Sequence, residues 1–149
     1  MAKNLRFEGI KELDQVLAAL SGDKALSNKV AGQILRKAEK PIVEEARRLV
    51  PVGEGDTKKS IGGIAGRGQG RGTQRYIGPR RGGPFKGYAG HLIEYGTAPR
   101  RKKNGQETGS MPARPFMRPA YDAKKDEAIQ IIKDECKAII LSEFKLVYK

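Results

Sequence analysis

The stretch LSNKVAGQILRKAEKPIVEEARRL, residues 26–49, decides the fold, because its apolar side chains recur every three or four positions. That period places them on one face of an α-helix. The face comprises Leu26, Val30, Ile34, Ala38, Ile42, Ala46 and Leu49. We therefore predict a long amphipathic helix that ends at Val50-Pro51, since the residue before a proline avoids the helical region. Pro41 lacks a backbone donor, so a kink or a break is expected near residues 37–40.

A short helix and a small sheet are predicted on either side of the long helix. Apolar residues between positions 10 and 20 keep helical spacing, which indicates a short N-terminal helix. The stretches 60–65, 73–78 and 90–96 combine β-branched or aromatic residues with flanking glycine or proline. This composition is typical of antiparallel strands joined by long connections.

The C-terminal part of the chain returns to a helical pattern. Helical spacing resumes after Phe116, and Pro119 suits the first turn of a helix that starts near Arg118. Residues 142–149 alternate apolar and polar side chains, as a further strand or a pairing tail would. The sequence thus predicts one α+β domain over residues 1–149. It would hold a short N-terminal helix, the long helix, a small antiparallel sheet with long basic loops, and a C-terminal helix packed on the sheet.

Positive charge is concentrated in the middle of the chain. The 149 residues include 30 Lys and Arg against 17 Asp and Glu, a formal charge of +13. Residues 53–119 alone hold 14 of these basic and 4 of these acidic residues, with 16 of the 19 glycines. Because glycine favours turns, the excess charge belongs to loops, at about residues 66–72 and 98–110. We expect the helices to form a scaffold and the loops to form the contact surface.

The sequence lacks the marks of a membrane-spanning, disulfide-bonded or catalytic protein. No apolar run approaches the roughly 18 residues of a spanning helix, and no secretory signal is expected. Cys136 is the single cysteine. Phosphate-loop, dinucleotide, metalloprotease and serine-hydrolase signatures are missing, and in a strand His91 and Glu94 would point to opposite faces. We expect no enzyme, no catalytic residue, no metal and no cofactor.

A basic nucleic-acid-binding protein is the alternative function. Lys and Arg on loops can neutralise phosphates without reading bases. The candidate residues for facing DNA or a DNA channel are Arg67, Arg71, Arg75, Arg80, Arg81, Arg100, Arg101, Lys102 and Lys103. Nearby aromatic residues are few, and no RNP, KH, zinc-finger or helix-turn-helix pattern occurs. Any single basic cluster can be explained as a solvated loop without a binding role. The occurrence of all these clusters in one segment makes that explanation less suitable for the set.

Four short marks occur in a fixed order along the chain. They are FEGIKEL at residues 7–13, PVGEGDTKKSI at residues 51–61, EYGT at residues 94–97 and ARPFMRPA at residues 113–120. Together they resemble the gene-ten-like family of long-tailed double-stranded DNA phages. Members of this family are minor structural proteins of the neck or tail-completion group, which act where the head joins the tail. The resemblance spans residues 5 to 122 and so covers most of the chain.

The resemblance implies a role in a virion assembled in the bacterial cytoplasm, without a membrane partner. It implies a homo-oligomeric ring, with six copies favoured and twelve as the other possibility. Further partners would be head-completion and tail-terminator or tail-tube proteins, and the packaged DNA end or the tape-measure protein. The motif or interface residues are Glu94, Tyr95, Gly96, Thr97, Arg114, Pro115, Phe116 and Arg118. We expect Glu94 to pair with Arg114 or Arg118, within the subunit rather than across an interface.

Overall fold

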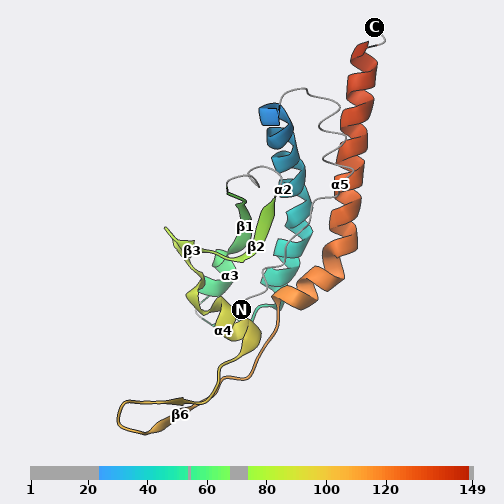
Figure 1. Ribbon diagram of the computed structural model, residues 1–149. Helices are drawn as coiled ribbons and strands as arrows, with labels where there is room; N and C mark the ends of the chain where they lie inside the picture. The colour runs from blue at the N-terminus through green and yellow to red at the C-terminus, as the bar shows by residue number, and fades with distance from the viewer. Residues whose placement is uncertain (1–23, 54, 68–73, 148–149) are drawn as a thin grey trace.

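A computed structural model of the chain describes residues 24–53, 55–67 and 74–147 (Figure 1). Its two long helices are α2, Lys24–Leu49, and α5, Met117–Val147. The shorter elements between them, in chain order, are α3 (Asp56–Ser60), β1 (Ile61–Ala65), β2 (Arg75–Pro79), β3 (Arg81–Gly82), β4 (Phe85–Lys86), the 3-10 helix η2 (Gly87–Ala89), α4 (Gly90–Tyr95), β5 (Arg100–Arg101) and β6 (Glu107–Gly109). Long helices with small antiparallel sheets confirm the predicted α+β class.

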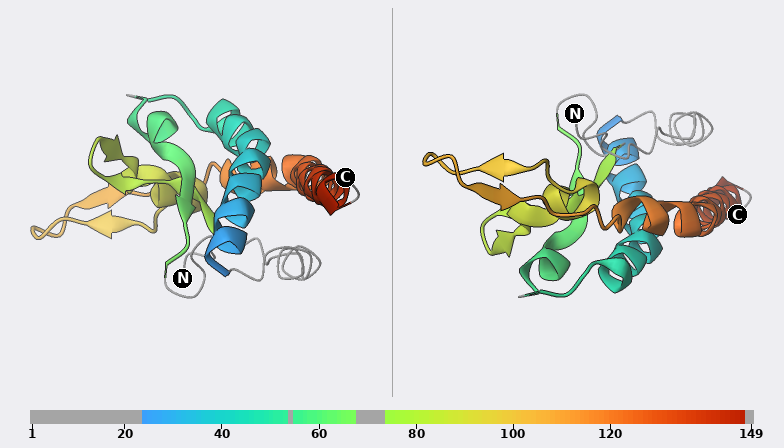
Figure 2. Two further views of the ribbon diagram at one scale, coloured as in Figure 1. Left: turned by 90° about the horizontal axis from the view of Figure 1, so that it is seen from above. Right: turned by 90° about the horizontal axis from the view of Figure 1, so that it is seen from below.

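Helix α2 forms the central layer of the molecule. The β1–β2 hairpin lies on one side of it and α5 on the other (Figure 2). The apolar face predicted from the sequence is buried, since Ile34, Ala38, Ile42 and Ala46 are each at most 2% exposed. Burial of an isoleucine side chain stabilises a fold by roughly 1.5–3 kcal/mol, so this face supplies much of the stability.

Two apolar clusters follow α2 along its length. The first joins Ile34, Ala38 and Ile42 to Ala128 and Ile132 of α5. The second lies at the C-terminal end of α2 and joins Val43, Ala46 and Val50 to Ile61, Phe116, Met117 and Ala120. The expected contact of the C-terminal helix with the sheet is therefore made by the first turn of α5, whereas the rest of that helix packs on α2.

Helix α2 continues through Pro41 without a break. Pro41 is itself buried, and its neighbours Ala38 and Ile42 contact α5. A proline inside a helix costs about 3 kcal/mol. The apolar contacts on both sides of Pro41 offset that cost, so the break allowed by the sequence does not occur.

The β1–β2 hairpin confirms two of the three predicted strands. Its register pairs Ile61 with Pro79 and Ala65 with Arg75. Arg47 of α2 donates a 2.8 Å hydrogen bond from Nη2 to the carbonyl oxygen of Ile61, which fixes the start of β1 against the helix.

The third predicted strand, residues 90–96, is wrong, because Gly90–Tyr95 forms helix α4. Gly96 ends this helix with a φ of 72°, and its amide donates to the carbonyl oxygen of Leu92 at 2.8 Å. Gly90 lies against Pro79 so closely that a Cβ would approach the proline ring to 2.4 Å. A short apolar run bounded by glycines does not distinguish a strand from a buried helical turn, and tertiary contacts decide here.

The C-terminal segment also differs from the prediction. Helix α5 continues to Val147, so residues 142–147 are helical rather than a strand or a tail. The predicted helix at residues 10–20, the FEGIKEL mark, residues 68–73 with Arg71, and the last two residues lie outside the described residues.

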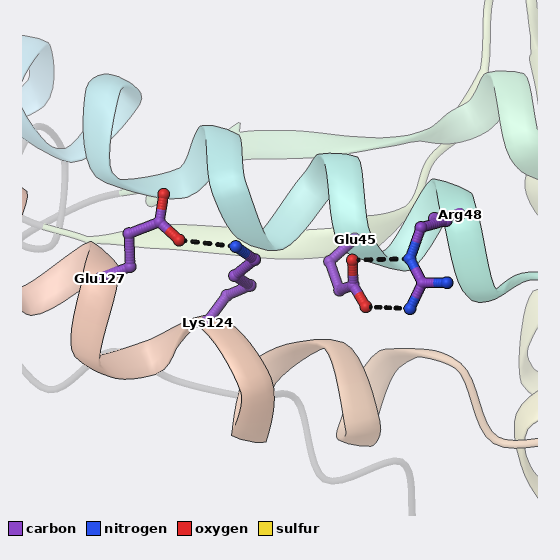
Figure 3. Close-up of polar contacts among 4 residues, drawn as sticks. All are labelled: Glu45, Arg48, Lys124 and Glu127. Atoms are coloured by element: carbon purple, nitrogen blue, oxygen red, sulfur yellow. Dashed lines mark hydrogen bonds and ion pairs between the residues drawn. The ribbon is translucent and has the colours of Figure 1, made fainter.

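Ion pairs line the exposed seam between the two long helices (Figure 3). Arg48 contacts Glu45 at 2.6 Å, and Lys124 contacts Glu127 at 2.7 Å. The hydrogen bond from Arg48 lowers the pKa of Glu45, and the bond to Glu127 raises the pKa of Lys124. Lys37 and Glu135 connect the helices at 2.7 Å. Because exposed pairs contribute little to stability, the apolar clusters hold the helices together.

Candidate interaction surface

A basic hairpin projects from the body of the molecule (Figure 1). We call residues 98–111 the arm; all of them are exposed, and they contain β5 and β6. Arg100 pairs with Gly109, and the turn is closed by the 2.8 Å bond from the Lys102 amide to the Gln106 carbonyl oxygen. The arm therefore keeps its shape through its own backbone bonds and not through burial.

The arm brings together four of the nine predicted DNA-facing or channel-facing residues. Arg100, Arg101, Lys102 and Lys103 follow one another along its first strand and turn, and all are exposed. Arg101 contacts Glu107 at 2.9 Å, and Glu107 is the arm's one acidic residue. The arm therefore carries an excess of positive charge, which suits contact with a polyanion or an acidic protein surface.

The base of the arm joins two of the sequence marks. Thr97 and Met111 exchange two bonds of 2.9 Å, from the Thr97 amide to the Met111 carbonyl oxygen and from the Met111 amide to the Thr97 hydroxyl. The Arg114 amide donates to the carbonyl oxygen of Ile93 at 2.8 Å. The segments that carry EYGT and ARPFMRPA thus lie side by side where the arm leaves the body.

Glu94 lies at the centre of this junction and caps α5. Its carboxylate accepts hydrogen bonds from the backbone amides of Phe116 at 2.7 Å, Met117 at 2.9 Å and Arg118 at 3.2 Å. A carboxylate at a helix N-terminus satisfies free amides and interacts favourably with the helix dipole. The predicted ion pair with the side chain of Arg114 or Arg118 is wrong, because the Glu94 carboxylate binds backbone amides instead. The contact does lie within the subunit, as expected.

Two of the predicted DNA-facing arginines make contacts within the subunit. Arg75 is 9% exposed and binds Glu39 of α2 through two bonds of 2.6 and 2.7 Å. Arg80 lies over the Phe85 ring at 3.6 Å and donates to the Ser60 carbonyl oxygen at 3.1 Å. The Arg75 guanidinium is not free to contact a phosphate, so its assignment to a DNA-facing surface is wrong. Arg80 is half-buried, and its assignment stays a prediction.

The remaining arginines differ in position. Arg67 is exposed at the end of the described part of the hairpin, and Arg71 lies outside the described residues. Arg81 is exposed and donates from Nη2 to His91 Nδ1 at 3.2 Å. Because α4 is a helix, His91 and Glu94 are one turn apart rather than on opposite faces. They still form no acid–base pair, since Glu94 is occupied by the α5 amides.

A pocket of about 350 Å³ opens between the hairpin, α4 and the start of α5, a volume near the lower end for small-ligand sites. Its apolar walls are Ile64, Ile77, Pro79, Phe116 and Met117, and Tyr76, Arg81, His91, Tyr95 and Arg118 also line it. Ile64 and Tyr95, which line it, are 47% and 54% exposed. Glu94 is its acidic lining residue, and the α5 amides hold that carboxylate. The pocket could not be predicted from the sequence, because its parts come from segments far apart in the chain.

The described residues contain no group of three or more His, Cys, Asp or Glu side chains arranged to hold a metal. Within the same residues, no helix has an apolar stretch long enough to cross a bilayer. Burial raises the pKa of the Cys136 thiol, which disfavours the reactive thiolate. Known protein families, curated proteins and solved structures were compared with this chain, and none matches it.

Gly96 tests how the arm is attached. Gly96→Ala is expected to lower the free energy of unfolding by about 1–3 kcal/mol, because φ is +72° and a Cβ would lie 2.6 Å from the Met111 carbonyl oxygen. Thermal unfolding followed by circular dichroism measures the change. Gly105→Ala is the matched control, since Gly105 has a φ of +81° but open space around it. Equal effects of the two substitutions would show that the junction is not tightly packed.

Proposed function

We propose that this protein is a structural virion component that forms a ring at the head–tail junction or at the top of the tail of a long-tailed phage. The arm supports this proposal most directly. It carries four consecutive basic residues outside the body, and its base is built from the EYGT and ARPFMRPA marks that resemble the gene-ten-like family. A projecting hairpin that buries nothing in its own subunit is suited to contact a neighbouring molecule.

The charge distribution favours an assembly role over free nucleic-acid binding. Arg75 is held inside the subunit and Arg80 is half-buried, so these two residues add little to the basic surface. The exposed basic residues of the arm belong to one narrow hairpin. In a ring, many copies of such a hairpin would bring their charges together, where they can face DNA without base readout or an acidic neighbouring ring.

Electron microscopy of lysates tests this function. Deletion of the gene from the phage or prophage that carries it is expected to leave filled heads and separate, unjoined tails. Complementation with the natural protein should restore joined particles. Complementation with the arm variant R100Q/R101Q/K102Q/K103Q should reduce infectious titre at least tenfold, because the arm loses its positive charge.

The control is K29Q/R36Q/K40Q/K133Q, which removes four exposed basic residues from α2 and α5. Intact, infectious particles from the deletion strain would overturn the proposed function. Strong, salt-sensitive binding of the purified monomer to DNA would instead favour the nucleic-acid-binding alternative.

A further inference from the structure

An exposed apolar residue on one side of the molecule matches the pocket on the other side. Val52 follows α2 and is 70% exposed, the largest exposure among the large apolar side chains of the described residues. Asp56 lies four residues further on, with its side chain 40% exposed, and its contact with Lys86 is long at 3.8 Å. The sequence places a second carboxylate, that of Glu54, in this segment.

The pocket has complementary properties. Its walls are apolar, and Arg81 and Arg118 are both exposed where they line it. The acidic residue among its lining, Glu94, accepts bonds from the α5 amides, and the positive end of the α5 dipole offsets part of its charge. An apolar side chain followed by acidic residues is the occupant that such a pocket favours.

Val52 does not enter the pocket of its own copy, because it is 70% exposed and is not among the residues that line the pocket. In both views of Figure 2, the connection between α2 and α3 lies on one side of the molecule, and the far end of the β1–β2 hairpin lies on the opposite side. Ile64 and Tyr76, near that far end, line the pocket. A contact between Val52 and the pocket must therefore join two copies.

We propose that the pocket of one copy receives Val52 of the next copy, with Asp56 facing Arg81 and Arg118. Two different surfaces meet in such a contact, so it is heterologous, and repeated around an axis it closes a ring. The inference rests on the proposed function in that it assumes a ring of copies, and it names the contact that builds the ring. Val52 then becomes buried, and the exposed faces of Ile64 and Tyr95 are covered.

Sedimentation velocity of the full-length protein tests the contact. The natural protein is expected to form species larger than a dimer as its concentration rises. Val52→Asn removes the apolar side chain without adding a charge that Arg81 and Arg118 would attract, and Arg118→Glu reverses a charge at the pocket. Each is expected to raise the concentration needed for association by about tenfold or more. Lys133→Glu, the same charge change on an exposed position of α5, is the control and should have no such effect.

Mixing the two variants distinguishes this contact from any other. A Val52→Asn copy keeps a natural pocket, and an Arg118→Glu copy keeps a natural Val52. An equal mixture should therefore form dimers and nothing larger. Association of either single variant like the natural protein would overturn the proposal, and so would a mixture that stays monomeric.

If the natural protein stays monomeric, a peptide-binding measurement tests the contact between Val52 and the pocket. A fluorescent peptide of residues 49–58 should bind the full-length protein and show at least tenfold weaker binding to Arg118→Glu or Ile64→Asp. Absence of binding at millimolar protein would overturn the contact. These tests use purified protein, so unjoined heads and tails in the deletion strain together with a failed peptide test would reject the contact while leaving the head–tail role standing.

Discussion

Arg75→Met is expected to lower the free energy of unfolding by about 3 kcal/mol, at the lower end of the range for breaking a buried ion pair. Arg75 and Glu39 have side chains only 9% and 13% exposed, and they share two short bonds. Without Arg75, the Glu39 carboxylate loses its partner in a site that water reaches poorly. Urea unfolding followed by circular dichroism measures the change.

A double substitution separates the ion pair from packing. Glu39→Met combined with Arg75→Met removes both charges, so it should be clearly more stable than Arg75→Met alone. The exposed pair of Arg101 and Glu107 offers the control, since Arg101→Met should change stability by less than about 0.5 kcal/mol. If Arg75→Met were as mild as Arg101→Met, the buried pair would not be a structural contact.

The same pair explains a glycine in β1. A Cβ on Gly63 would lie 1.9 Å from the Glu39 carboxylate oxygen, so a side chain at this position would displace that carboxylate from Arg75. The ion pair and the glycine therefore depend on one another, and together they set the distance between the hairpin and the helix.

Glu94→Ala is expected to destabilise the protein by about 2–3 kcal/mol. The substitution leaves the Phe116 and Met117 amides, which are buried at the start of α5, without their acceptor. Hydrogen exchange at these amides should become faster, and thermal unfolding should shift to a lower temperature. Because the same residue joins α4 to α5, the arm's base should also loosen.

Two variants make the Glu94 result specific. Glu94→Gln keeps one acceptor oxygen and should fall between the natural protein and Glu94→Ala. Glu107→Ala removes an exposed acid from the arm and should change stability by less than about 0.5 kcal/mol. Unchanged exchange at Phe116 and Met117 in Glu94→Ala would show that the cap does not hold the start of α5.

The parts of the fold that follow from local periodicity could be predicted from the sequence. The spacing of Ile34, Ala38, Ile42 and Ala46 predicted α2 and its buried face, and Pro119 marked the start of α5. Helix α4 could not be predicted, because its glycines and apolar residues fit a strand equally well until Pro79 and the α5 amides are in place.

The candidate site was predictable only in part, for a related reason. Arg75 and Arg100 look alike in the sequence, and only the approach of Glu39, 36 residues away, separates a structural arginine from an exposed one. The basic arm could be predicted because its four positively charged residues are consecutive in the sequence. Glu94 is an acidic residue in a basic segment, which marks it in the sequence. Its role as the cap of α5 could not be predicted, because it depends on amides 22 to 24 residues further along the chain.

The central position of α2 has a consequence for synthesis of the protein on the ribosome. Its apolar face is completed by α5, and the contact of Lys37 with Glu135 joins positions 98 residues apart. At about 5–20 residues per second, translation needs roughly 5–20 s to produce the intervening chain. During this time the apolar face of α2 lacks its α5 contacts, so the packing of the first apolar cluster is completed only when α5 appears.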